Sequence, residues 1–250
     1  MARSRDYIKW PAPDEMRALA DINNEAFGLP NMPLGVDGSL IRLAAKPSIE
    51  ECPPHTLPNN FISRKRFPAI NIQVVGDSHH LIRDCNVQWV GSTHDGRVWR
   101  NSRAKKLIER QAVYAIAADS AYPIARTVVK PYGATPTESH VNFNFAQARL
   151  RNDCTEKIFG QVKSRFRILH TGLRTSIERS QLLIVSCLVL HNMALMFHDS
   201  EFEALEDGDD DGVDDLGPEE PNPGQPESPS EAQIRSAGEA YRKSLRKYFE

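Results

Sequence analysis

The chain has 250 residues, of which 40% are hydrophobic and 26% are charged, so it can bury one good core and a single domain is the expected organisation. The N-terminus lacks the pattern of a signal peptide, and the longest apolar run is far shorter than the roughly 20 residues that span a bilayer. The composition therefore predicts neither a secreted nor a membrane protein. Four scattered cysteines without a CxxC pair signal no zinc site or disulfide framework, and they fit a reducing compartment.

Charge is distributed very unevenly along the chain. Residues 199–231 contain 14 acidic residues and no Lys or Arg, whereas residues 1–198 contain 26 Lys and Arg against 17 acids, a balance of +9. A body this basic favours a polyanionic partner. A basic protein without such a partner is the alternative that charge alone leaves open.

The predicted elements alternate in the order expected of a mixed sheet covered by helices. A lead-in helix precedes a first strand, a hairpin, a helix, a strand buried on both faces, a short extended piece and two long helices. We therefore predict an α/β fold with helices flanking a mixed sheet. The ranges are 15–27, 34–43, 69–75 with 85–89, 95–110, 112–118, 125–129, 138–169 and 178–197, the last being a largely buried helix.

Two further segments follow the predicted domain of residues 1–198. The acidic stretch 199–232 has several Pro and Gly and almost no large apolar residues, so it cannot bury enough surface to order itself and is predicted to be a disordered linker. Residues 233–250 are predicted to form a basic amphipathic helix that could dock back on the domain. Its apolar stripe consists of Ile234, Ala237, Tyr241, Leu245 and Phe249.

Three acids lie where secondary structure would not favour them. Asp37 interrupts the first strand, Asp119 ends the buried strand, and Glu156 lies one helical step before Phe159, on the face expected to pack on the sheet. Buried carboxylates need hydrogen bonds, opposite charges or metal ions. A pair of Mg²⁺ ions held by such acids could activate a water for attack on a phosphodiester. The alternative is that the two aspartates only end strands and cap turns, and that Glu156 is partly exposed.

Six stretches of the chain, in this order, resemble the PIF/Harbinger transposases and the nucleases derived from them, over about residues 32–197. One such stretch would be weak evidence, whereas six in the right order are strong. The stretches are Gly35 to Ser39 (GVDGS), Phe61 to Gln73 (FISRKRFPAINIQ), Gly91 to Asp95 (GSTHD), Asp119 to Pro123 (DSAYP), Glu156 to Phe166 (EKIFGQVKSRF) and Leu190 to Asn192 (LHN).

The resemblance implies a ribonuclease H-like nuclease of the DDE kind. Its catalytic acids fall on Asp37, Asp119 and Glu156, which would hold two divalent ions, Mg²⁺ or Mn²⁺, and cut DNA phosphodiesters, with strand transfer as a further capacity. The rival interpretation is a transposase-derived DNA- or protein-binding module that has lost its chemistry. The resemblance also implies a separate Myb-like DNA-binding partner. A nuclear location is expected, with the cytoplasm left open as a second location. The oligomeric state is left open.

Asp95 and a set of basic residues have two interpretations each. As the last residue of a Ser-x-x-Asp box, Asp95 is explained by helix capping, but the GSTHD stretch also makes it a further candidate metal ligand. The basic residues are candidates for DNA phosphate contacts, and an ordinary solvated face is the alternative. They are Arg64, Lys65, Arg66, Lys163 and Arg165.

Two features depart from the family pattern. The family usually has a helix-turn-helix-like region before the nuclease domain, whereas 36 residues precede Asp37, so site-specific DNA recognition is not expected. The family also implies a basic residue four positions before the glutamate, where this chain has Asn152, while Arg151 stands five positions before Glu156. This offset suggests a local shift in helix register.

Overall fold

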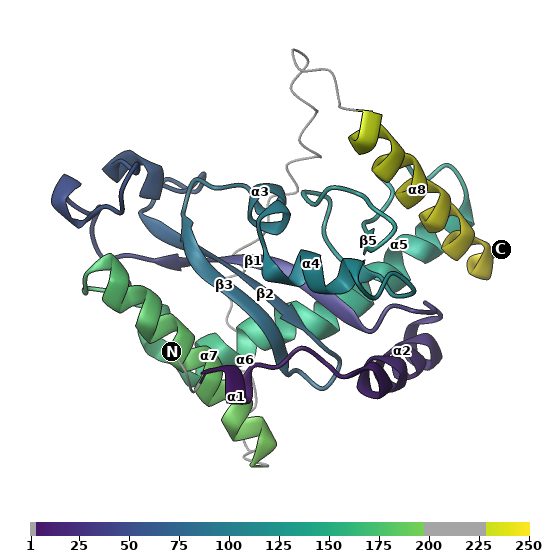
Figure 1. Cartoon of the computed structure of the whole chain (residues 1–250), viewed down its shortest axis with the longest axis horizontal. Coiled ribbons are helices and arrows are strands. Elements are labelled where there is room, and N and C mark those ends of the chain that lie inside the picture. Colours follow the sequence, from purple (N-terminus) through teal and green to yellow (C-terminus); the bar gives the residue numbers. More distant parts are fainter. Residues whose placement is uncertain (1–3, 198–228) are drawn as a thin grey trace.

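A five-stranded mixed sheet runs through the centre of the computed structural model, which describes residues 4–197 and 229–250 (Figure 1). Its order is β3-β2-β1-β4-β5. The first three strands are antiparallel, and β4 and β5 run parallel to β1. This order confirms the expected α/β fold and is the ribonuclease H-like arrangement. The strands are β1 (Leu34–Arg42), β2 (Ala69–Gly76), β3 (Ile82–Val90), β4 (Ile116–Ala117) and β5 (Val128–Val129).

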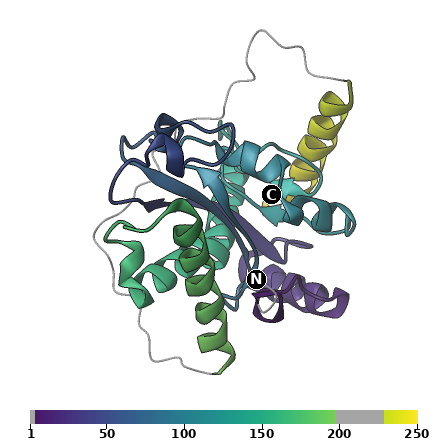
Figure 2. The same ribbon diagram turned by 60° about the vertical axis from the view of Figure 1, so that its left-hand side comes forward.

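Helices cover both faces of this sheet because successive strand residues point to opposite sides (Figures 1 and 2). On one side Val36 packs with Trp99 and Ile108, beneath α2, α3 and α4. On the other side Ile72 packs with Val162 and other residues of α6 and α7. The helices are α1 (Ser4–Tyr7), α2 (Pro13–Phe27), α3 (Asp95–Arg100), α4 (Arg103–Glu109), α5 (Glu138–Arg151), α6 (Lys157–Arg165), α7 (Ile177–Met196) and α8 (Pro229–Arg246).

One turn of π-helix, η3 (Asn152–Glu156), joins α5 to α6 and lies directly on the sheet. Gly35 and Gly76 are paired across β1 and β2. A Cβ on Gly35 would lie 2.8 Å from Cys154 Cβ, and a Cβ on Gly76 would overlap the carbonyl oxygen of Cys154. The two glycines therefore leave bare backbone on which the π turn rests.

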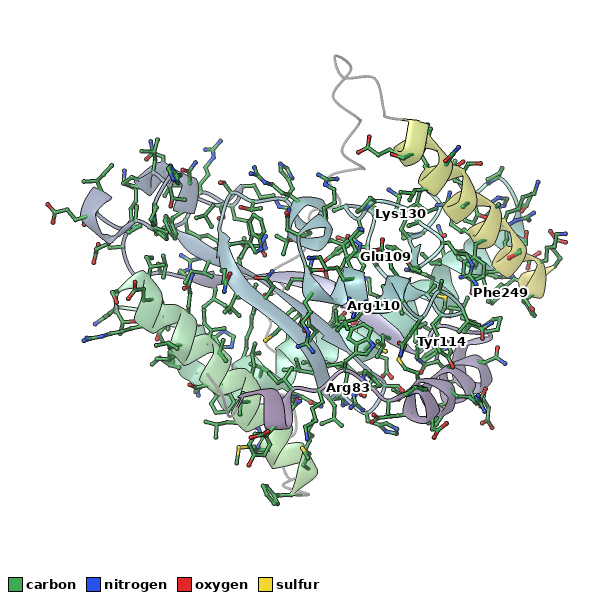
Figure 3. All side chains as sticks on the ribbon, viewed as in Figure 1. Arg83, Glu109, Arg110, Tyr114, Lys130 and Phe249 are labelled. Atoms are coloured by element: carbon green, nitrogen blue, oxygen red, sulfur yellow. The ribbon has the colours of Figure 1, made fainter. Side chains whose placement is uncertain are left out.

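The β2–β3 turn is fixed by a buried ion-pair network. Asp77 accepts hydrogen bonds from the backbone N–H groups of His79 and Leu81, at 2.9 and 3.0 Å. Arg83, labelled in Figure 3, donates to Asp77 and, at 2.6 Å, to Glu15 on α2. The turn of the predicted hairpin is thus confirmed, and the contact between Arg83 and Glu15 links α2 to that turn.

The C-terminal helix α8 packs against β5 and α5 (Figure 1). Leu245 is 2% exposed, and Phe249 lies edge-on to Phe143 with ring centroids 6.0 Å apart. Arg242 donates to the carbonyl oxygen of Pro131 at 2.9 Å. The predicted apolar stripe thus docks at its C-terminal end, while Ile234 is exposed.

Three predicted elements have different bounds in the structure. The helix expected over 95–110 is two helices, because Ser102 caps α4 by accepting from Lys105 N. The buried strand expected over 112–118 pairs only at Ile116–Ala117, since Ala112 and Val113 are exposed. The long helix expected to reach residue 169 ends at Arg165 and is followed by a short 3-10 turn, η4 (Arg167–Leu169).

The prediction that α7 is largely buried is wrong. Ile184, Leu188 and His191 face the core, but Leu182 and Leu190 are each 48% exposed. By length and composition this one helix among the described residues would also suit a membrane span. It packs on α1, β3 and α6 along one face, as core helices of other folds do.

Residues 198–228 lie outside the described residues, and with them most of the predicted acidic linker of residues 199–232. The disorder of this segment stays a prediction. The division into a domain of residues 1–198, a linker and a C-terminal helix of residues 233–250 stays a prediction as well.

We expect Gly76→Ala to destabilise the protein, because the added methyl would overlap the backbone carbonyl oxygen of Cys154 as well as the end of the Ile158 side chain. Overpacking of this kind costs about 1–3 kcal/mol, and each kcal/mol lowers Tm by about 2–4 °C in a chain of this size. Gly133→Ala is the matched control, since a methyl group added there would have no other atom within 4 Å. Thermal unfolding followed by circular dichroism measures both, and equal Tm values for the two variants would contradict the close packing of η3.

Candidate active site

Asp37 projects from β1 into a buried position. It is 4% exposed, its Oδ1 accepts from the backbone N–H of Gly38 at 2.8 Å, and its Oδ2 accepts from Arg151 Nη1 at 2.7 Å. Burial raises the pKa of Asp37 to about 7, opposed by the charge of Arg151 and reinforced by that of Asp119. The protein thus holds a carboxylate where water cannot stabilise its charge.

Asp119 follows β4, the strand that runs parallel beside β1. Its Oδ1 accepts from the N–H of Ala121 at 3.0 Å, and Lys130 Nζ (labelled in Figure 3) donates to the carbonyl oxygen of Ser120 at 3.0 Å. Gln147 of α5 donates to the carbonyl oxygens of Ala118 and Val129, at 2.8 and 3.0 Å. The end of β4 is therefore held from three sides. Burial, and then the charge of Asp95, raise the pKa of Asp119.

Asp95 approaches β1 at Gly38, the residue after Asp37. A Cβ on Gly38 would lie 2.5 Å from Asp95 Oδ1. Because neighbouring strand residues point to opposite faces, Asp95 reaches β1 from the α3 side, whereas Asp37 points toward η3. Asp95 Oδ1 also accepts from Asn71 Nδ2 at 3.0 Å, and burial raises its pKa.

The predicted capping role of Asp95 is wrong. His94 is the N-cap residue of α3, and no side chain caps that helix end. The side chain of Asp95 instead accepts a hydrogen bond from Asn71 and lies close to the backbone at Gly38.

Glu156 reaches the site through Arg151 rather than through the sheet. Its side chain is 42% exposed, and its Oε1 lies 2.7 Å from Arg151 Nη2. The prediction that Glu156 follows the sheet-packing face is therefore wrong, while Phe159 does pack there. Arg151 directly precedes the π turn, and Glu156 is the last residue of that turn. The wide turn brings these two side chains, five residues apart, to the same side of the helix.

The structure thus brings Asp37 near Asp119 and links Asp37 to Glu156 through a guanidinium. Within residues 4–197 and 229–250, no three His, Cys, Asp or Glu side chains form a ready-made metal-binding group. The available donors are nonetheless carboxylate oxygens with raised pKa values, and hard oxygen donors suit Mg²⁺ and Mn²⁺. The donor set fits such ions once Arg151 no longer separates Asp37 from Glu156.

A cleft of about 850 Å³ opens beside Asp37 and Glu156, whereas Asp119 is not among the residues that line it. Asp37, Asp95 and Glu156 lie in its wall, together with three of the predicted phosphate-contact residues, Arg64, Lys65 and Lys163. The other two, Arg66 and Arg165, are not among the residues that line it. The cleft therefore brings acidic and basic side chains together along one wall.

Sequence reasoning missed the residues that support the acids. Tyr122 is fully buried under them and accepts a hydrogen bond from Gln73 Nε2 at 2.9 Å. Asn71 and Gln147 likewise lie within strands or helices that give no sign of a polar role. For Arg151 a signal existed, since its offset of one position from the family pattern is what a π turn accommodates.

Comparison with known proteins assigns the chain to a family. Residues 36–192 match the family described as DDE superfamily endonuclease. The chain belongs to this family. No solved structure matches it significantly.

The curated relatives are Harbinger-derived proteins of modest identity. A Homo sapiens protein named "Putative nuclease HARBI1" is 28% identical over 77% of this chain and 54% of its own length. "Protein ALP1-like" from Arabidopsis thaliana is 25% identical over 82% of this chain and 52% of its own length. The chain thus spans about half the length of the curated relatives it matches, and the expected membership of this DDE group is confirmed.

We expect Asp119→Asn to raise the thermal stability of the protein in EDTA at pH 8. Because its pKa is raised, Asp119 binds its proton more tightly in the folded protein, so stability falls as pH rises through that pKa. Asn removes the repelled charge and still accepts from the N–H of Ala121. The gain should shrink as the pH falls through the raised pKa and should vanish only below the unfolded value of 3.8, where the carboxyl group is protonated in both states.

The control for this prediction is Asp14→Asn, an exposed acid on α2, which should show no such gain. Melting curves measured across pH test this prediction. A Tm for Asp119→Asn at or below that of the parent protein at pH 8 would show that the charge of Asp119 does not destabilise the folded protein.

Proposed function

We propose that this domain is a metal-dependent DNA endonuclease whose catalytic carboxylates are Asp37, Asp119 and Glu156. The observation that carries the proposal is the pair of buried aspartates, Asp37 on β1 and Asp119 just after the parallel neighbour β4, the charge of Asp119 raising the pKa of Asp37. Such an arrangement costs stability, and groups of this kind cluster at functional sites. Membership of the DDE endonuclease family supports the same conclusion.

The chain's own residues have separable parts in this proposal. A pair of divalent cations, Mg²⁺ or Mn²⁺, would be held by the three carboxylates and would supply an activated water and stabilisation of the leaving oxygen. Asp37 and Asp119 are fixed by backbone N–H groups and stand ready as rigid ligands. Glu156 is exposed on a helix and can adjust its position.

The basic residues of the cleft wall are suited to the DNA backbone rather than to base edges. Arg64, Lys65 and Lys163 present cationic groups beside the acids, where phosphates would bind. Strand transfer, a Myb-like DNA-binding partner and a nuclear location extend this proposal, and they rest on the family resemblance.

A catalytically inactive DNA- or protein-binding module is the second candidate function. The observation that favours it is the double ion pair of Arg151, which engages both Asp37 and Glu156 without a metal. In an inactive descendant that pairing would be permanent.

Cleavage of a labelled DNA duplex with Mg²⁺, Mn²⁺ or EDTA tests the proposal. We expect metal-dependent cleavage by the parent protein and background levels for Asp37→Asn, Asp119→Asn and Glu156→Gln, because each change removes an anionic ligand while keeping the shape. Asp95→Asn should retain measurable cleavage, since Asp95 is not one of the three proposed metal ligands and its Oδ1 is already engaged by Asn71.

Circular dichroism checks that each variant is folded. An inactive Asp95→Asn beside an active Asp119→Asn would show that the triad is wrongly assigned. Absence of cleavage by the folded parent protein with either metal would favour the binding module.

DNA binding should weaken steeply with salt, because phosphate contacts release condensed counterions. We expect Lys163→Gln to reduce the slope of log K against log[salt] by about 0.9, the value for one lost phosphate contact. Arg17→Gln, an exposed base on α2, is the charge-matched control and should leave the slope unchanged. Fluorescence anisotropy over a salt series measures both, and equal slopes would remove Lys163 from the DNA contact surface.

A further inference from the structure

Arg151 makes two close charge contacts in the candidate active site. Its Nη1 lies 2.7 Å from Asp37 Oδ2 and its Nη2 lies 2.7 Å from Glu156 Oε1. The Arg151 side chain is 18% exposed and that of Asp37 6%, so this contact is shielded from most of the solvent, whereas the Glu156 side chain is 42% exposed. The planar guanidinium therefore uses its two ends to hold two carboxylates apart at a fixed spacing.

The π turn is what makes this bridge feasible. In a regular α-helix, residues five apart point to different sides, whereas the wider π turn brings them onto one side. Arg151 and Glu156 are related in this way across η3. The same turn is seated on β1, so the bridge ends on Asp37 of that strand.

A divalent cation and the guanidinium compete for the same oxygens. Asp37 has one oxygen committed to the N–H of Gly38 and the other to Arg151. An ion shared by Asp37 and Glu156 would need the oxygens that Arg151 occupies. Arg151 also lines the open cleft, which gives its side chain room to leave.

We propose that Arg151 is an internal counterion of the metal-free site, which a divalent cation displaces from Asp37 and Glu156 when it binds. This inference rests on the proposed function, because it takes those two carboxylates as metal ligands. Arg151 is then a positioning residue: it keeps the acids in place without metal, and its displacement weakens metal binding.

Calorimetric titration with Mn²⁺ alone tests the proposal without an activity assay. We expect Arg151→Gln to bind Mn²⁺ about tenfold more tightly than the parent protein, a gain of about 1.4 kcal/mol, because no ion pair has to be broken. In EDTA the same variant should melt at a lower temperature than the parent protein, and Mn²⁺ should raise its Tm by more.

Two further variants separate the bridge from the charge. Lys157→Gln removes the same charge one residue beyond η3, from a side chain that pairs with Asp153 instead, and should leave the affinity for Mn²⁺ unchanged. Arg151→Lys keeps the charge but replaces the two-ended planar guanidinium with a compact ammonium group that holds the two carboxylates less firmly. It should therefore bind Mn²⁺ more tightly than the parent protein and less tightly than Arg151→Gln.

Asp37→Asn identifies which proposal fails. If the parent protein binds Mn²⁺ and Asp37→Asn does not, the metal site of the proposed function stands. Equal or weaker binding by Arg151→Gln would then overturn the counterion role alone, as would a Lys157→Gln effect of the same size or an Arg151→Lys affinity equal to that of the parent protein. If neither the parent protein nor Arg151→Gln binds Mn²⁺, both proposals fail.

Discussion

The geometry of the candidate site depends on the absence of side chains at two facing positions of the sheet. Gly35 and Gly76 let the backbone of η3 rest directly on β1 and β2, closer than any Cβ would permit. That contact sets the height of the helical run above the sheet. It thereby fixes where Arg151 and Glu156 stand relative to Asp37, although neither glycine touches these side chains.

The burial of three aspartates destabilises the protein, and apolar packing elsewhere in the fold offsets this loss of stability. Burial raises the pKa values of Asp37, Asp95 and Asp119, because it disfavours the charged form of each carboxyl group unless a positive charge lies beside it. Apolar clusters on both faces of the sheet stabilise the fold and offset the free energy lost by burying these charges. The counterion comes from a helix rather than from the sheet, and it can move more easily than a strand residue.

Much of the fold could be predicted from periodicity, because the strands alternate or are uniformly apolar and end at clear turns. The placement of Asp37 beside Asp119 followed from strand adjacency in the family fold. The roles of Glu156 and Arg151 could not be predicted, since counting at 3.6 residues per turn cannot register a single wide turn. The exposure of α7 was missed for a related reason: a helix that is apolar all round reads as buried, yet only one of its faces meets the sheet.

The docking of α8 has a consequence for the sheet as a whole. β5 is an outer strand of only two residues, and outer strands offer unpaired backbone groups to any strand that passes. A segment from the far end of the same chain lies against it, with Gly238 so close to Ala125 that a methyl group would not fit. Extension of the sheet into a neighbouring molecule at this side therefore requires the chain first to release its own C-terminus.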